Sequence, residues 1–138
     1  MKYFTPIIAL FIFISCASKQ VINENEIVIN STSLTKVGND YEMKITKILS
    51  DSRCPEGVEC IWAGEVQLEL EIYKNQKFEK TETLSINYKT VEQNKDFFAK
   101  YILIDKKVKD ILVQPVKKEG QNIELKDYVL KVELECYK

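Results

Sequence analysis

Two segments of the chain alternate between apolar and polar residues, and this period of two constrains the fold most. From Val66 to Ile72 every second residue is apolar, and the residues between are Gln or Glu. Residues 128–136 repeat the pattern with one exception, Val129. Alternation of this kind puts the apolar side chains on one face of a β-strand and the polar ones on the other. Both segments are therefore predicted to be strands with one buried face.

Shorter apolar stretches, separated by Gly, Asn and Asp in turn-forming positions, predict the other strands. These weaker candidates are residues 26–30, 41–48, 78–88, 100–104 and 111–116. Only residues 91–100 have the composition of a short helix. So many short strands indicate an all-β fold, an antiparallel, immunoglobulin-like β-sandwich of about seven or eight strands. A small β-barrel is the alternative.

Composition excludes several functional classes. The 138 residues include 20 basic and 21 acidic side chains, a balance that argues against a nucleic-acid-binding protein. The chain has no histidine, which excludes Ser-His-Asp and Cys-His catalytic groups and His-ligated zinc. We therefore expect no catalytic residue, cofactor or metal site.

The first residues have the pattern of an export signal. Lys2 precedes an apolar run at residues 4–14, which spans only about 16 Å as a helix, about half of a bilayer core. The run ends at Ser15-Cys16, which resembles the lipobox of bacterial lipoproteins. That resemblance implies that residues 1–15 are removed and that Cys16 carries a lipid anchor in the membrane. A plain secretory signal with an incidental cysteine is the alternative.

The same resemblance implies a cell-envelope, extracytoplasmic location, where disulfides persist. Ala17 follows the anchor cysteine, and the absence of aspartate there favours the outer membrane over the inner one in a cell with two membranes. Residues 16–25 would be a lipidated tether, and residues 26–138 a single β-sandwich domain.

Residues 51–65 concentrate the unusual residue types: the one arginine, the one tryptophan and two of the four cysteines. Pro55 suits the second position of a turn that starts at Cys54, and Gly57 suits the fourth. Such a turn brings Cys54 and Cys60 together. We predict a disulfide there, which contributes about 2–2.5 kcal/mol for so short a loop. A redox pair or a metal site is less consistent with the spacing and with the lack of further soft ligands.

The same loop offers a candidate contact surface for an envelope protein. Arg53, Glu56 and Trp62 are its candidate contact residues. Structural roles compete with this interpretation. Arg53 could grip one carboxylate and hold the shape of the loop, which lysine does poorly. For Trp62 we expect a core position over the disulfide.

Cys136 lies in the last alternating segment, on the same face as Leu134. We expect it to be a buried free thiol that packs as a small apolar side chain. An intermolecular bridge, or pairing with Cys54 or Cys60, is the alternative.

The order of these pieces resembles a group of small bacterial lipoproteins that carry an Arg-Cys-Pro…Cys-x-Trp-x-Gly motif. The matching pieces are Arg53-Cys54-Pro55, Cys60-Ile61-Trp62-Ala63-Gly64, Val113-Gln114-Pro115 and Asp127-Tyr128. The resemblance implies a β-sandwich and an envelope location, and it implies no activity.

The resulting hypothesis is a lipid-anchored, non-enzymatic binding or structural module that presents residues 51–65. One alternative is an inhibitor of extracytoplasmic proteases, since a disulfide-held loop can present a preorganised bait. A less favoured one is a hydrolase that uses two carboxylates. The sequence indicates no ligand and no oligomeric state.

Overall fold

The chain forms two antiparallel sheets in a computed structural model that describes residues 25–136. The predicted signal peptide, Cys16 and all but the last residue of the tether lie outside this range. The elements in chain order are β1 (Glu26–Asn30), β2 (Thr35–Lys36), β3 (Tyr41–Asp51), β4 (Val66–Lys74), β5 (Lys77–Ile86), α1 (Val91–Ala99), β6 (Lys106–Gln114), the 3-10 helix η1 (Leu125–Asp127) and β7 (Val129–Cys136). Within the described residues, no helix has the length and hydrophobicity needed to cross a bilayer.

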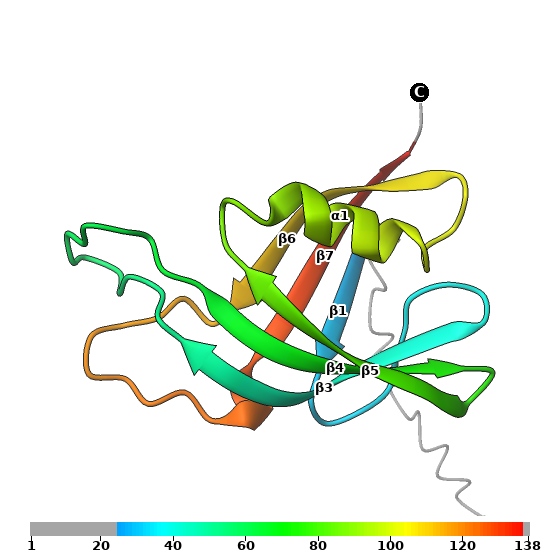
Figure 1. Cartoon of the computed structure of the whole chain (residues 1–138), viewed down its shortest axis with the longest axis horizontal. Coiled ribbons are helices and arrows are strands. Elements are labelled where there is room, and N and C mark those ends of the chain that lie inside the picture. Colours follow the sequence, from blue (N-terminus) through cyan, green and yellow to red (C-terminus); the bar gives the residue numbers. More distant parts are fainter. Residues whose placement is uncertain (1–24, 137–138) are drawn as a thin grey trace, which may run out of the picture.

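The two sheets pack face to face, with strand orders β1-β7-β6 and β2-β3-β4-β5 (Figure 1). Neither sheet closes on itself. The predicted antiparallel sandwich is therefore confirmed, and the alternative of a closed β-barrel is wrong. The path of the chain differs from that of an immunoglobulin domain. Strands β2 to β5 are consecutive in one sheet, whereas immunoglobulin strands move between sheets through Greek-key connections.

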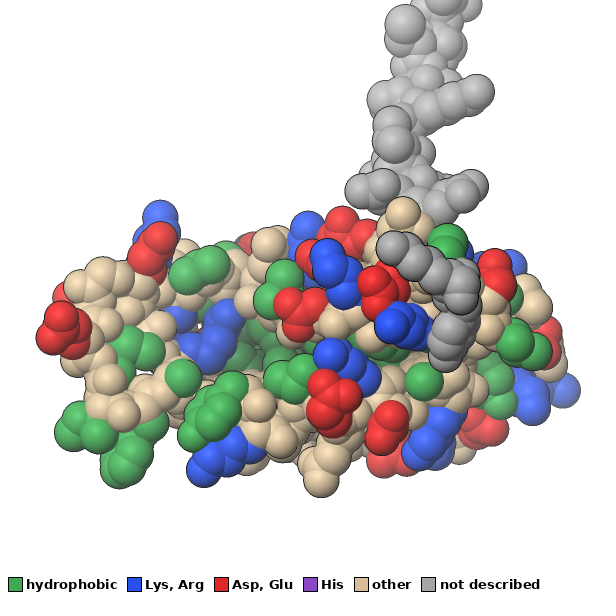
Figure 2. Space-filling model, turned by 90° about the horizontal axis from the view of Figure 1, so that it is seen from above, with side chains coloured by type: hydrophobic (Ala, Val, Ile, Leu, Met, Phe, Trp, Pro, Cys, Tyr) green, Lys and Arg blue, Asp and Glu red, His purple; other side chains and the backbone are tan. Residues whose placement is uncertain are grey.

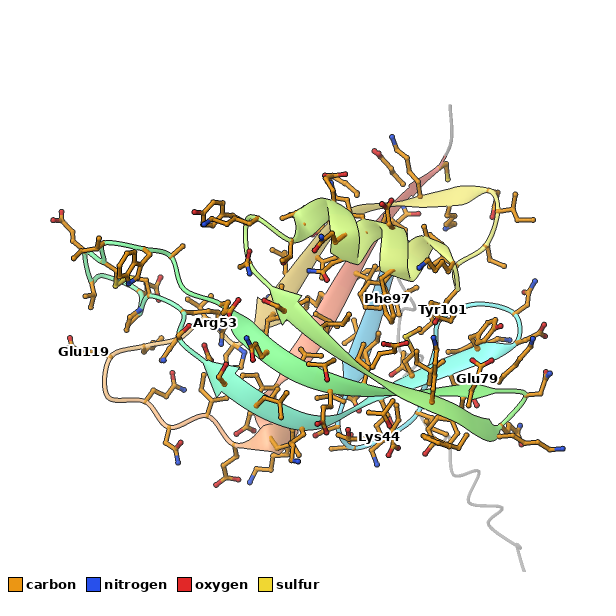
Figure 3. The ribbon with its side chains drawn as sticks, in the orientation of Figure 1. Lys44, Arg53, Glu79, Phe97, Tyr101 and Glu119 are labelled. Atoms are coloured by element: carbon orange, nitrogen blue, oxygen red, sulfur yellow. A yellow bond between two sulfur atoms is a disulfide. The ribbon has the colours of Figure 1, made fainter. Side chains whose placement is uncertain are left out.

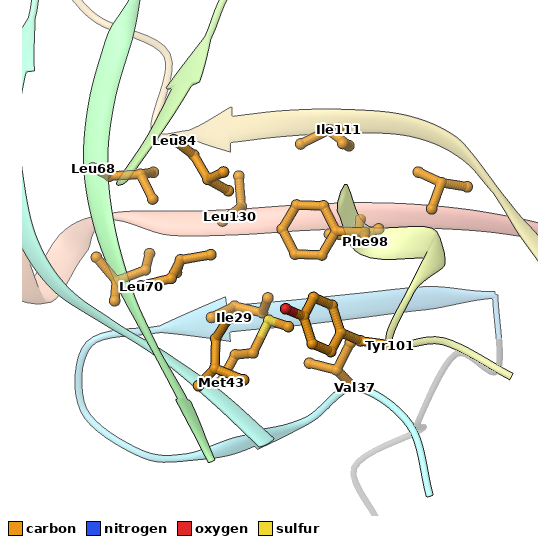
Figure 4. Packing of buried hydrophobic residues seen from close by; sticks show 14 of the residues in the cluster. Ile29, Val37, Met43, Leu68, Leu70, Leu84, Phe98, Tyr101, Ile111 and Leu130 are labelled. Atoms are coloured by element: carbon orange, nitrogen blue, oxygen red, sulfur yellow. The ribbon is translucent and has the colours of Figure 1, made fainter. Parts of the chain in front are cut away.

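The core lies between the sheets and follows the alternation in the sequence. Val66, Leu68, Leu70 and Ile72 of β4 are fully buried, and on β7 Leu130 and its alternating neighbours face them from the other sheet. Figure 4 shows side chains from both sheets meeting Phe98 of α1. Burial of this apolar area, at about 25 cal/mol per Å², is the main force that holds the layers together.

Helix α1 covers the side of the sandwich between β5 and β6, as Figure 1 shows. The ring of Phe98 is fully buried, and the Phe97 ring lies 5.1 Å from it. The Tyr101 ring packs edge-on against Tyr41 of β3 at 5.0 Å between centroids. The predicted helix is confirmed, and Tyr101, just after its end, contacts the four-stranded sheet.

The predicted strand at residues 100–104 is wrong, because these residues form the turns that end α1. The amides of Tyr101 and Ile102 both donate to the carbonyl of Phe98, at 2.9 and 3.2 Å. Burial of Tyr101 against the core holds the chain in this helical turn and leaves Ile104 in solvent.

The prediction for Cys136 is half correct. It is the free cysteine of the described residues and makes no disulfide there, but its side chain is exposed. Cys136 ends β7 opposite Lys106, the first residue of β6, so no apolar layer covers this last position of the alternating face.

Candidate functional site

Residues 51–65, named the Cys-loop below, join β3 to β4 and project beyond the sandwich (Figure 1). The base of the loop continues the antiparallel ladder of the two strands. The Ser52 amide donates to the Glu65 carbonyl at 2.9 Å, and the Cys54 amide donates to the Ala63 carbonyl at 2.9 Å. The loop is therefore an extension of a hairpin and is held by backbone hydrogen bonds at its root.

Gly64 makes this close approach possible. Its φ is +73°, and a Cβ built on it would lie 1.9 Å from the carbonyl oxygen of Ser52. Only glycine combines that backbone conformation with so near a neighbouring chain.

The predicted disulfide between Cys54 and Cys60 is present, with 5.9 Å between the Cα atoms. The turn that it encloses starts one residue later than predicted. The Val58 amide donates to the Pro55 carbonyl at 3.2 Å, and Gly57 is the third residue of the turn with φ +80°. A type II turn needs positive φ at its third position, and Gly57 supplies it.

The guanidinium of Arg53 points into the protein, at the root of the loop (Figure 3). Nε donates a hydrogen bond to Asp51 Oδ1 at 2.9 Å, and Nη2 donates one to Oδ2 at 2.7 Å. Nη1 donates to the carbonyls of Val113 and Pro115, at 2.8 and 2.9 Å, where β6 ends. Arg53 therefore makes the forked bond to one carboxylate that a structural role requires, and it also bonds one carbonyl of the other sheet and one just after the end of β6.

Asp51 is the centre of this cluster. Its Oδ2 also accepts a hydrogen bond from the Tyr128 hydroxyl at 2.9 Å. Burial by itself raises the pKa of Asp51, but the hydrogen bonds from Arg53 and Tyr128 outweigh it and hold the pKa below its usual value. Burial and the bond to Asp51 raise the pKa of Tyr128 to about 12. The network therefore favours a charged Asp51 and a protonated Tyr128.

The cluster joins three pieces of sequence that lie far apart in the chain. Residues around Arg53, Val113-Gln114-Pro115 and Tyr128 belong to the motif pieces described above, and they meet at the Asp51 carboxylate and the Arg53 guanidinium. A second attachment adds to this, since Lys117 Nζ donates to the Asp51 carbonyl at 2.6 Å. Sequence reasoning missed Val113, Pro115, Lys117 and Tyr128 as partners of the loop.

The outer part of the Cys-loop is apolar and uncovered. Ile61 is 93% exposed and Trp62 is 77% exposed, and Val58 is also exposed. The expectation of a core position for Trp62 is wrong, because the hairpin extends past the edge of both sheets and leaves this side chain in solvent. Figure 2 shows hydrophobic side chains gathered at this end of the molecule.

The tip is also acidic. Residues 54–64 include Glu56 and Glu59 and no basic residue. The Glu56 side chain is exposed, while its amide donates to the Lys117 carbonyl at 2.8 Å. Of the three candidate contact residues, Glu56 and Trp62 are therefore at the surface, and Arg53 is engaged within the protein.

No family model, curated protein or solved structure matches this chain. The assignment of a function therefore depends on the site itself.

A groove beside the loop is the other concave feature near the site. It encloses about 350 Å³ between β5, α1 and β6, and its lining is mostly apolar, with the polar residues Arg53, Asn87, Asn94 and Asp110. Asn94 is buried, and its amide donates to the Ser85 carbonyl at 2.8 Å and to Thr90 Oγ1 at 3.1 Å. Its donors are thus used to hold α1 against β5.

The Glu65 carboxylate accepts hydrogen bonds from Ser85, Gln67 and Asn87, and Asn87 lines the groove. These bonds lower the pKa of Glu65. The pKa values of Asp51 and Glu65 are both lowered, whereas a general acid in hydrolysis needs a raised pKa. Neither carboxylate supports the hydrolase hypothesis. The part of the chain that the structure describes has no cluster of three or more potential metal ligands among its His, Cys, Asp and Glu side chains.

Proposed function

We propose that this chain is a lipid-anchored binding module of the cell envelope, and that its Cys-loop contacts a protein partner through Trp62 and Ile61. The observation that carries the proposal is the exposure of these two side chains at the end of a loop that is held at its root and closed by a disulfide. The anchor at Cys16 is supported by the lipobox-like end of the export signal.

The rigidity of the loop favours binding. Two backbone hydrogen bonds, the disulfide and the Asp51–Arg53 pair restrict it before any partner arrives. A preorganised loop loses less conformational entropy on association than a mobile one, so more of the contact energy becomes affinity.

The chemistry of the tip indicates what the partner surface would be. A large aromatic side chain beside an aliphatic one is a typical binding hot spot when it enters an apolar pocket. Glu56 and Glu59, both exposed, give this apolar tip negative charge. The complementary surface is therefore an apolar pocket with basic groups at its rim.

Arg53 has a different role in this proposal from the one its sequence position suggested. Its donors are bound to Asp51 and to the carbonyls of Val113 in β6 and of Pro115 just after it, so it positions the loop and does not contact the partner.

The proposal is tested by using the full-length, detergent-solubilised protein to capture partners from envelope fractions, and then measuring their affinity in purified form. Trp62→Ala should weaken binding by about 30-fold, as expected for a hot spot worth about 2 kcal/mol. Phe78→Ala is the matched control, since Phe78 is an exposed aromatic residue in the β4–β5 hairpin. A partner that binds the Trp62→Ala and wild-type proteins equally would refute the Cys-loop as the contact.

The lipid anchor is tested independently by the mass of the mature protein. Cleavage before Cys16 with an added diacylglyceryl group is the expected result. A mature chain without a lipid would refute the anchor and leave the loop proposal standing.

A further inference from the structure

We infer that the turn between α1 and β6 rests on the lipid bilayer and directs the Cys-loop away from it. This inference rests on the proposed anchor at Cys16 and adds a second membrane contact made by the folded domain. Its central residue is Ile104, which is 97% exposed, with exposed Leu103 beside it.

The chain enters the folded domain next to this turn. Lys106 Nζ donates to Asn25 Oδ1 at 3.2 Å, and the Lys106 amide donates to the Leu103 carbonyl at 3.1 Å. The Leu134 amide donates to the Asn25 carbonyl at 2.8 Å, which places Asn25 beside the C-terminal part of β7. The α1–β6 turn and the first described residue therefore share one end of the sandwich.

The length of chain between Cys16 and Asn25 keeps this end close to the membrane. Nine peptide bonds join the two residues, so their Cα atoms lie at most about 32 Å apart. The root of the Cys-loop is farther along the fold from Asn25. Tyr128, which binds Asp51 there, lies six residues before Leu134 along the β7 side of the fold, about 20 Å at strand spacing.

The surface around the turn is richer in lysine than the Cys-loop tip. Residues 99–109 include four lysines and one aspartate, and two of the lysines, Lys107 and Lys109, pair with Glu135 and Glu133 of β7. The Cys-loop tip at residues 54–64 has two glutamates and no basic residue. Lysines beside exposed aliphatic side chains suit an interface with anionic lipid headgroups, and an acidic tip does not. A hollow of about 380 Å³ beside Leu103 is lined by apolar Val37 and Leu134 and by charged Asp105 and Lys106.

The two exposed apolar features lie toward opposite ends of the molecule. Figure 1 places the Cys-loop at one end of the longest axis and the α1–β6 turn toward the other. If the turn meets the bilayer, the loop is presented to the aqueous side, where a protein partner can reach it.

The single tryptophan of the chain allows a direct test. The full-length, processed protein is reconstituted in phosphatidylethanolamine–phosphatidylglycerol vesicles that contain dibromo-phosphatidylcholine, and tryptophan quenching is measured. The wild-type protein reports on position 62 without any substitution. A Trp62→Phe, Ile104→Trp variant reports on position 104, where the exposed site tolerates the larger side chain.

We expect fluorescence at position 104 to fall about twofold, because a side chain at the headgroup–acyl boundary lies within reach of the brominated chains. Fluorescence of Trp62 should be unchanged. Quenching of Trp62, or no quenching at position 104 in protein whose mass shows the lipid, would overturn the orientation and leave the anchor intact. A mature mass without lipid would overturn the anchor and this orientation together.

Discussion

Replacing Arg53 by alanine should destabilise the fold by an amount that the geometry allows us to estimate. The change removes four hydrogen bonds, two to the Asp51 carboxylate and two to the carbonyls of Val113 and Pro115. The side chains of Arg53 and Asp51 are only 18% and 9% exposed. Breaking a buried ion pair costs about 3–5 kcal/mol, and an exposed one costs about 0–1 kcal/mol. This pair is close to the buried limit but still reached by water, so we expect a loss of about 2–4 kcal/mol.

A matched ion pair on the surface provides the control. Lys80 and Glu82 lie 2.7 Å apart, the same separation as Arg53 and Asp51, but their side chains are 45% and 38% exposed. Lys80→Ala should therefore cost less than about 1 kcal/mol. The comparison separates the effect of burial and added carbonyl bonds from the effect of ion pairing itself.

Urea unfolding followed by far-ultraviolet circular dichroism measures both variants. With a slope of about 1–3 kcal/mol per molar urea, Arg53→Ala should lower the midpoint by about 1–2 M, with the slope unchanged. Arg53→Lys should recover only part of the loss, because an ammonium group cannot reproduce the forked geometry. Equal midpoints for the Arg53→Ala and Lys80→Ala proteins would refute the claim that this cluster joins the loop to the second sheet.

Four further predictions concern the loop and its root. Gly64→Ala should cost about 2 kcal/mol or more in urea unfolding, whereas Gly57→Ala, which also has positive φ but meets nothing within 4 Å, should cost about 1 kcal/mol; equal costs would contradict the close approach to Ser52. Replacing both disulfide cysteines by serine should lower stability by about 2–2.5 kcal/mol, and an unchanged midpoint would contradict the bond. Since the pKa of Tyr128 is raised in the folded state to about 12, its contribution is complete below about pH 10 and declines as the pH rises from about 10 to 12. Tyr128→Phe should remove that alkaline decline from the pH profile of stability, and an identical profile would contradict the coupling to Asp51. Trp62→Ala should change stability by less than about 0.5 kcal/mol, and a larger loss would show that the exposed side chain has a structural role.

The sandwich was accessible from sequence because alternation is a local signal. Each apolar position from Val66 to Ile72 belongs to one face of one strand, so no knowledge of distant residues is needed to place it. The disulfide was accessible for a similar reason, since Cys54 and Cys60 are separated by a single turn. Residues 100–104 show where the local signal fails, because a short apolar run fits a strand as well as the turn that ends a helix.

The role of the loop residues depended on information that is not local. Whether Trp62 is covered depends on how far its hairpin projects past the second sheet, which the sequence of the hairpin does not state. The partners of Arg53 include two backbone carbonyls about sixty residues away, and a carbonyl is present at every position. The sequence therefore indicates that the loop is unusual. It does not show that Arg53 holds the root of the loop in place or that Trp62 is exposed at its tip.

Photo-crosslinking in living cells shows whether the tip of the Cys-loop meets a protein partner. Benzoylphenylalanine is introduced at Ile61 of the full-length chain and, as a control, at Phe78. We expect one discrete protein adduct from position 61 and none from position 78. Absence of a protein adduct from position 61, or the same adducts from both positions, would contradict this expectation.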